Sequence, residues 1–182
     1  MKKLILLLFI TIFISGCAFT DYLEEQENLE KELALYSTGD LVTLGDIQFY
    51  VVSTSQSSAS LDLITTDVLN DDFFEDKEGT TCEKLTKKMG KEGYQIEDCS
   101  NLSKFVIEEQ CTKVTMGVDY KYNCSDVDFI AIDKDYWIDG SDVSYPEFVY
   151  FYNGNGMIES EKNHKGHGVR PVIEIKLSEL KK

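Results

Sequence analysis

Alternating apolar and polar positions predict β-strands near both ends of the chain. The alternation is clearest in residues 47–52. The other strand-like runs are short apolar or aromatic segments, namely residues 41–44, 61–66, 128–132, 136–138, 148–152 and 169–175. The first two runs meet at Gly45-Asp46, a dipeptide typical of tight turns between antiparallel strands, so the amino end predicts an antiparallel meander. The last run contains Pro171 near its start, which favours an edge strand or an irregular entry into the sheet.

The carboxyl-terminal third predicts an aromatic hairpin. Residues 148–152 and 157–158 flank the glycine-rich segment 153–156, which has the composition of a turn. Side chains alternate between the two faces of a strand. The expected division is Phe148, Tyr150 and Tyr152 on one face, with Val149 and Phe151 on the other.

Between these groups the apolar positions recur at helical spacing. One helix is predicted from residue 80 to Gly90, where the glycine provides a stop signal. A second is predicted over residues 102–110, capped by Ser100 or Asn101. Strands and helices together predict an α+β domain over residues 37–182, built of small antiparallel sheets with flanking helices.

Four cysteines in the middle of the sequence indicate two disulfides: Cys82, Cys99, Cys111 and Cys124. Among the three connectivities we favour Cys82–Cys99 with Cys111–Cys124, because both pairs close short loops. Each such loop contributes ~3 kcal/mol in the chain-entropy model. Zinc binding is the alternative, but no Cys-x-x-Cys pair is present and the two histidines are distant in the sequence.

The chain is strongly acidic, with 33 acidic and 18 basic residues and a formal net charge of −15. This charge repels nucleic acid and anionic lipid head groups, so we expect no nucleic-acid partner. Cations, basic proteins and neutral ligands such as sugars are compatible with it. Solubility alone is the simpler explanation of the acidity.

The first seventeen residues have the organisation of an export signal. A basic head precedes the apolar run of residues 4–14, and Ile14-Ser15-Gly16 leads to Cys17. This segment resembles a bacterial lipoprotein signal, which implies cleavage before Cys17 and attachment of lipid to its sulfur. The alternative is an uncleaved transmembrane anchor, but the run is shorter than the ~20 residues that a spanning helix needs.

This resemblance divides the chain into three parts. A signal peptide is expected over residues 1–16, a lipidated tether with a charged helix over 17–36, and the α+β domain over 37–182. The membrane is then a partner through the lipid on Cys17. The expected location is the cell membrane or the outer membrane, facing the periplasm or the exterior.

Several motifs of the domain resemble those of a group of bacterial surface domains of unknown function. They are Gly39-Asp40-Leu41-Val42, Phe49-Tyr50-Val51-Val52, Tyr136-Trp137-Ile138, the hairpin 150–158 and Gly168-Val169-Arg170-Pro171-Val172-Ile173. The group is similar in motif order to the C-type-lectin-like fold of sulfatase-modifying-factor relatives. This chain departs from the pattern at Ile138, where the group has leucine, and at Asp139-Gly140, where it often has Arg-Ser. The resemblance carries over no catalytic residue.

Four residues are candidates for ligand binding: Trp137, Tyr150, Tyr152 and Arg170. An exposed row of tyrosine and tryptophan can stack on sugar rings or on a partner's aromatics, whereas a covered row forms core. Arg170 is the only arginine. We expect it to pair with a buried carboxylate at the last strand, and binding of a ligand carboxylate is the alternative.

Metal and catalytic signatures are weak or missing. The aspartates between residues 126 and 142 could supply oxygen ligands for calcium, but they lack the EF-hand pattern. A metal site at His164 and His167 would need further ligands, and both histidines are expected in a polar surface loop. No nucleophile-elbow, P-loop or zinc-protease motif is present, so no catalytic residue, metal or cofactor is predicted.

The sequence therefore predicts a membrane-anchored bacterial lipoprotein that acts as a surface or periplasmic binding module for a glycan, peptide or protein. Two alternatives belong to other classes. One is an enzyme related to sulfatase-modifying factors, which requires a reactive cysteine. The other is a purely structural envelope protein.

Overall fold

The computed structural model describes residues 22–69, 80–116, 119–141, 148–162 and 167–181. The chain divides into two units, Met1–Tyr36 and Ser37–Lys182. In the first unit residues 22–33 form a helix, with Tyr22 and Leu23 exposed. No helix among the described residues is long and apolar enough to cross a membrane.

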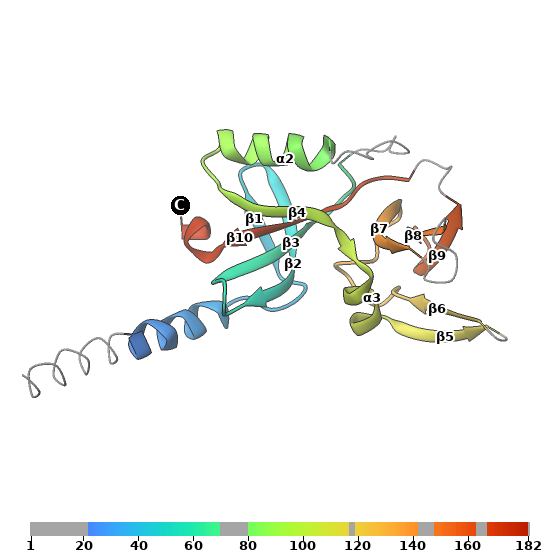
Figure 1. Ribbon diagram of the computed structural model, residues 1–182, viewed down its shortest axis with the longest axis horizontal. Helices are drawn as coiled ribbons and strands as arrows, with labels where there is room; N and C mark the ends of the chain where they lie inside the picture. The colour runs from blue at the N-terminus through green and yellow to red at the C-terminus, as the bar shows by residue number, and fades with distance from the viewer. Residues whose placement is uncertain (1–21, 70–79, 117–118, 142–147, 163–166, 182) are drawn as a thin grey trace, which may run out of the picture. The chain divides into compact units, whose positions relative to one another are not determined.

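The second unit contains one sheet of ten strands in the order β1-β2-β3-β10-β4-β7-β8-β9-β6-β5 (Figure 1). The strands are β1 (Leu41–Leu44), β2 (Ile47–Ser55), β3 (Ser60–Thr65), β4 (Ile96–Ser103), β5 (Thr112–Met116), β6 (Asp119–Asn123), β7 (Asp135–Ser141), β8 (Phe148–Asn153), β9 (Met157–Lys162) and β10 (Pro171–Lys176). Neighbours are antiparallel except β4 and β7, which are parallel.

The α+β class is confirmed, but the expectation of small antiparallel sheets is wrong. Two antiparallel groups of strands are joined into one mixed sheet where Leu102 and Ser103 of β4 pair with Ile138 and Asp139 of β7. The sequence did not predict this joint, because β4 reads Ile-Glu-Asp-Cys-Ser-Asn-Leu-Ser and has no regular apolar alternation.

The local strand predictions at both ends are confirmed. The strands β1, β2 and β3 form the antiparallel meander, with Gly45 at the first turn in a left-handed conformation (φ +59°). The strands β8 and β9 form the aromatic hairpin. The strand predicted over residues 128–132 is wrong: this segment is turn and loop, and it buries Phe129 and Ile130 in the core.

The helix α2 (Thr80–Lys91) runs through Gly90 and ends one residue later than predicted. The Tyr94 amide donates to the carbonyl of Met89, and the Gly93 amide donates to that of Gly90. With Gly93 at φ +92°, this is the hydrogen-bond pattern of a Schellman ending, which satisfies the last carbonyls of the helix.

The helix α3 (Lys104–Gln110) begins two residues later than predicted. Its cap is Ser103, whose hydroxyl accepts a hydrogen bond from the Phe105 amide, and not Ser100 or Asn101. The reason is tertiary: Leu102 is fully buried and pairs with Ile138, so β4 continues up to the cap.

The last strand β10 lies in the middle of its group of strands, between β3 and β4, so the edge position suggested by Pro171 is wrong. Proline is tolerated because it is the first residue of the strand. A short 3₁₀ helix, η1 (Leu177–Lys181), follows β10.

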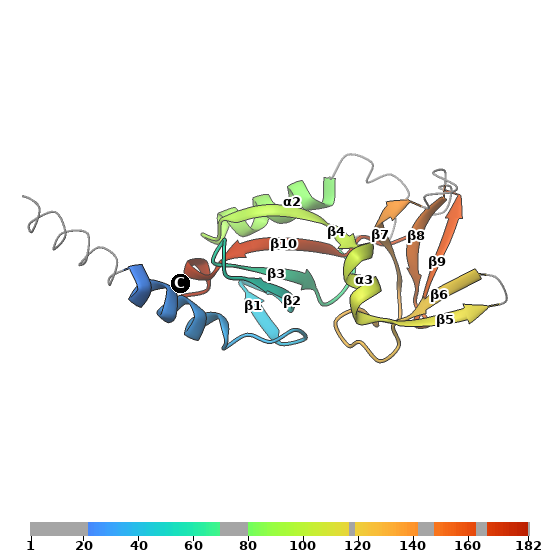
Figure 2. The same cartoon turned by 60° about the horizontal axis from the view of Figure 1, so that its bottom comes forward.

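Apolar side chains cover both faces of the β2-β3-β10-β4 part of the sheet. On one face lie Leu61, Leu63, Ile173 and Ile175, and α2 covers this side with its buried Leu85 and Met89 (Figures 1 and 2). A second core cluster includes Val52, Ile64, Leu102, Ile107, Ile130, Tyr136, Ile138 and Tyr152. This second cluster extends the core to β7 and β8.

Both favoured disulfides are present. Cys82–Cys99 ties the first turn of α2 to β4, with the two Cα atoms 5.7 Å apart. Cys111–Cys124 ties the end of α3 to the end of β6, with Cα atoms 4.7 Å apart, and both of its cysteines lie in the second core cluster. Each of these four cysteines is therefore bonded to a partner sulfur.

Candidate functional site

The segment Gly168–Pro171 brings the carboxyl-terminal motif into the centre of the domain. The Gly168 amide donates to the Asp135 carbonyl, and the Gly168 carbonyl accepts from the Trp137 amide. A Cβ atom on Gly168 would lie 2.7 Å from Val68 Cγ1 and 3.0 Å from the Asp135 carbonyl oxygen. Only glycine permits this close approach, which places His167 and Arg170 on opposite sides of β7.

Arg170 is fully buried, as predicted, but its hydrogen-bond partners are not the expected carboxylates. Among the described residues, Nε donates to the Thr65 carbonyl at 2.6 Å and Nη1 to the Ile130 carbonyl at 3.1 Å. The guanidinium carbon lies 5.3 Å from the centre of the Tyr136 ring. Burial lowers the pKa of Arg170, and Tyr136 opposes that shift. Arg170 is therefore an interior staple and is not displayed on a surface.

Tyr136 and Tyr152 stack in this core, with ring centres 5.1 Å apart. The Tyr136 hydroxyl donates to the Ile130 carbonyl at 2.9 Å, and burial raises the pKa of this hydroxyl. Tyr152 is 2 % exposed. Neither ring is displayed at the surface, so the candidate Tyr152 belongs to the core.

Tyr150 is half-buried and packs against the same core cluster. The Lys104 ammonium donates to its hydroxyl at 3.1 Å and lies 4.4 Å from the ring centre. Burial alone would lower the pKa of Lys104, but Tyr150 and Glu108 together raise it above the usual value. Lys104 thus covers Tyr150.

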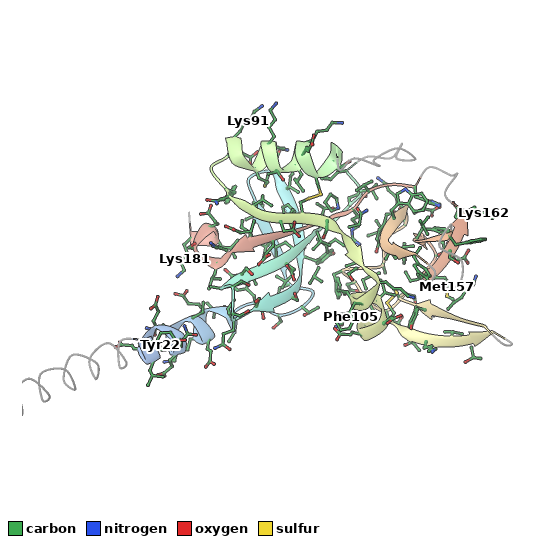
Figure 3. The ribbon with its side chains drawn as sticks, in the orientation of Figure 1. Tyr22, Lys91, Phe105, Met157, Lys162 and Lys181 are labelled. Carbon is green, nitrogen blue, oxygen red and sulfur yellow. A yellow bond between two sulfur atoms is a disulfide. The ribbon has the colours of Figure 1, made fainter. Side chains whose placement is uncertain are left out.

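Trp137 lies on the opposite face of the hairpin from Tyr150. Its register partner is Phe151, and side chains directly opposite in an antiparallel pair share a face. The same register places Asp135 beside Asn153, and Phe151 beside Glu159. We name this side of the hairpin the Trp137 face; it consists of Asp135, Trp137, Phe151, Asn153, Glu159, Glu161 and His167, of which Phe151 and His167 are buried. In Figure 3, Met157 and Lys162 mark the two ends of β9, which supplies its glutamates.

His167 is the polar centre of the Trp137 face. It was expected in a polar surface loop with His164; His164 lies outside the described residues, and for His167 the expectation is wrong because it is only 5 % exposed. Its ring stacks on Phe151 at 4.1 Å and meets Trp137 edge-on at 4.5 Å. The nitrogen Nε2 lies 2.8 Å from Glu161 Oε1, and Nδ1 lies 3.6 Å from Asp135 Oδ2.

This arrangement joins one predicted candidate, Trp137, to residues that the sequence analysis had not assigned to a ligand site. Glu161 was missed altogether, whereas Asp135 and His167 were considered as metal ligands and not chosen. The available signal was the alternation in β7 and β8, which separates Trp137 and Phe151 from Tyr136 and Tyr152. Within the described ranges, no group of three or more His, Cys, Asp or Glu side chains is arranged to hold a metal ion.

Cys17, the predicted lipidation site, lies outside the described residues. No protein-family model matches the chain, and neither a curated protein nor a solved structure matches it.

Proposed function

We propose that the chain is a membrane-anchored bacterial lipoprotein whose α+β domain is a binding module. The signal-like first seventeen residues support the anchor, with Cys17 as the lipidated residue. The membrane-bound domain would face the periplasm or the exterior. The motif order Tyr136-Trp137, aromatic hairpin and Gly168 to Ile173 supports a distant relation to C-type-lectin-like domains, which superposition on an experimental structure would test.

One observation supports the binding role more than any other: the only tryptophan is partly exposed, on the opposite face of β7 from the buried Tyr136. Its strand neighbour Tyr136 is fully buried, so the larger of the two aromatic side chains is the one that keeps contact with solvent. An indole that is partly exposed leaves a flat apolar surface in contact with water. This contact is unfavourable, and a bound ligand that covers the ring would remove it. Such residues are enriched where proteins bind other molecules.

The chemistry of the Trp137 face favours a ligand rich in hydrogen-bond donors. Asp135, Glu159 and Glu161 are carboxylates that only accept hydrogen bonds when ionised. Sugar hydroxyls donate to such groups, and a sugar ring stacks on an aromatic side chain through its apolar face. We therefore propose a glycan as the ligand, with a basic peptide as the other outcome of the test.

The test is a glycan array and a basic-peptide array probed with the wild-type protein, with Trp137→Ala and with Phe105→Ala. Phe105 is the matched control, because it is an aromatic 65 % exposed on α3 (Figure 3). Loss of Trp137 should weaken glycan binding about tenfold or more, as for a central contact residue. Equal binding by all three proteins, or binding to neither array, would contradict the proposal.

The anchor is tested separately by mass spectrometry of the amino-terminal peptide from the membrane fraction. We expect a peptide that begins at Cys17 and carries the mass of a diacylglycerol thioether. Recovery of an intact peptide that begins at Met1 would reject the lipoprotein signal. Titration of free thiols in the unfolded protein distinguishes the binding module from an enzyme with a cysteine nucleophile, which would leave at least one of the four domain cysteines free.

A further inference from the structure

The imidazole of His167 is fixed in position by its surroundings. Phe151 lies parallel to the ring, with an interplanar angle of 11°, and Trp137 closes one edge at 80°. The next residue, Gly168, is hydrogen-bonded to β7 through both its amide and its carbonyl. The ring therefore has little freedom to reorient, which is the preorganisation that a ligating side chain needs.

Glu161 determines which nitrogen of the ring carries hydrogen. Its carboxylate lies 2.8 Å from Nε2, and its side chain is only 14 % exposed. Because an ionised carboxylate can only accept, Nε2 must donate. In the neutral imidazole, Nδ1 then carries the lone pair. A carboxylate that orients a histidine from the outer side is the usual second partner of a metal-bound imidazole.

The Nδ1 side of the ring lies near another electron-rich atom, Asp135 Oδ2. Nδ1 is buried and has no hydrogen-bond partner among the described residues. The nearest charged atom is Asp135 Oδ2 at 3.6 Å, which is too far for a hydrogen bond. Two ligands of one tetrahedral zinc, with metal bonds of ~2.0–2.1 Å, lie about 3.3 Å apart. The observed separation is close to that value.

Charge and access also suit a dication. The neutral imidazole contributes no charge, while Glu161 and Asp135 contribute one negative charge each. The Asp135 side chain is 50 % exposed, whereas Nδ1 is buried, so water would reach a bound ion from the Asp135 side. Water molecules can therefore complete its coordination.

We propose that His167 Nδ1 and the Asp135 carboxylate form a binding site for a divalent transition ion of the zinc class, with Glu161 as the orienting partner. Imidazole nitrogen selects such ions over calcium and magnesium, which prefer oxygen ligands alone. Because the described chain supplies two ligands, binding is weaker than in a structural zinc site with four. Asp135 and Glu161 belong to the Trp137 face as well, but zinc binding is measured without a glycan, so the two proposals can fail separately.

The test is calorimetric titration of zinc chloride into the full-length chain after removal of metals by a chelator. A Cys17→Ser background removes a thiol that would bind zinc elsewhere. We expect one saturable site, and a ¹⁵N NMR spectrum in which the Nδ1 resonance of His167 shifts while Nε2 keeps its proton. His167→Gln and Asp135→Asn should each lower the zinc affinity at least tenfold. Glu161→Gln should lower it less, because the amide oxygen still accepts from Nε2.

Asp98→Asn is the control, since it removes an exposed carboxylate from β4 and should leave the affinity unchanged. Circular dichroism checks the fold of each variant, and Asp135→Asn remains decisive if His167→Gln does not fold, because the Asp135 side chain is half-exposed. Two results would overturn the proposal: no saturable zinc binding by the wild-type chain, or wild-type affinity in both ligand variants.

Discussion

His167 and Arg170 are three residues apart, yet the surroundings of these two nitrogen-rich side chains differ. Arg170 lies in the core, where backbone carbonyls of Thr65 and Ile130 surround its charge. His167 lies on the other side of β7, between the carboxylates of Glu161 and Asp135. Uncharged dipoles in a dry interior favour a structural role, whereas carboxylates near water favour exchange of protons or ions.

The largest effect should come from Arg170→Met, which keeps the apolar stem and removes the donors. Two buried carbonyls then lose a hydrogen bond, and we expect the free energy of unfolding to fall by about 2–4 kcal/mol. Lys176→Met is the matched control, because Lys176 is a half-exposed cation on β10 whose ion pair with Glu97 is worth at most about 1 kcal/mol. Urea unfolding curves measure both. Equal losses of unfolding free energy in the two variants would show that the hydrogen bonds of Arg170 do not stabilise the core.

Two glycine substitutions test the close approach of Gly168 to β7, which separates His167 from Arg170. Gly168→Ala places a Cβ against Val68 and the Asp135 carbonyl, and we expect a loss of about 1–3 kcal/mol from overpacking. Gly90→Ala meets no atom within 4 Å on the exposed side of α2 and should stabilise by about 0.5–1 kcal/mol. Thermal unfolding of the two variants should shift in opposite directions, and shifts of the same sign would contradict the geometry.

Tyr136→Phe tests whether water is excluded around Arg170, through the pH dependence of stability. It removes the hydrogen bond to the Ile130 carbonyl and should cost about 1 kcal/mol near neutral pH. Burial raises the pKa of the Tyr136 hydroxyl, so the folded protein holds this proton more tightly than the unfolded chain. This contribution is complete below the unfolded pKa of about 10 and is lost as the pH rises toward the folded value.

The stability difference between wild type and Tyr136→Phe should therefore shrink between pH 8 and pH 10.5. Tyr22→Phe, at an exposed tyrosine of the amino-terminal helix, is the control and should show no such change. Urea unfolding at the two pH values measures the difference. A difference that does not vary with pH would mean that the Tyr136 hydroxyl is solvated.

The smallest effect is expected for His167→Gln. Its polar partners lie on a face that opens to water at Asp135, so the groups left behind can be hydrated. Loss of stacking on Phe151 should cost about 1 kcal/mol in unfolding free energy. The unfolding free energies of His167→Gln and Arg170→Met should be measured side by side in metal-free buffer. If His167→Gln loses as much stability as Arg170→Met, the two sides of β7 do not differ in the way described.

Features set by short-range chemistry were predictable from the sequence. The turn at Gly45, the alternation in β8 and the two short disulfide loops each depend on residues close together in the chain. The partners of Arg170 could not be predicted, because Thr65 and Ile130 are 105 and 40 positions away in the sequence. They accept through backbone carbonyls, which every residue type has. The burial of His167 likewise depends on Trp137 and Phe151, which only the folded hairpin brings to it.

The place of β10 has a consequence for the order of events during synthesis. The strand inserts between β3 and β4, which were made more than 65 residues earlier, so neither can complete its hydrogen bonding until the end of the chain emerges. A nascent or truncated chain that stops before Pro171 exposes two open strand edges, the template for pairing with other chains. Late closure of this kind makes an intact β10 a safeguard against aggregation.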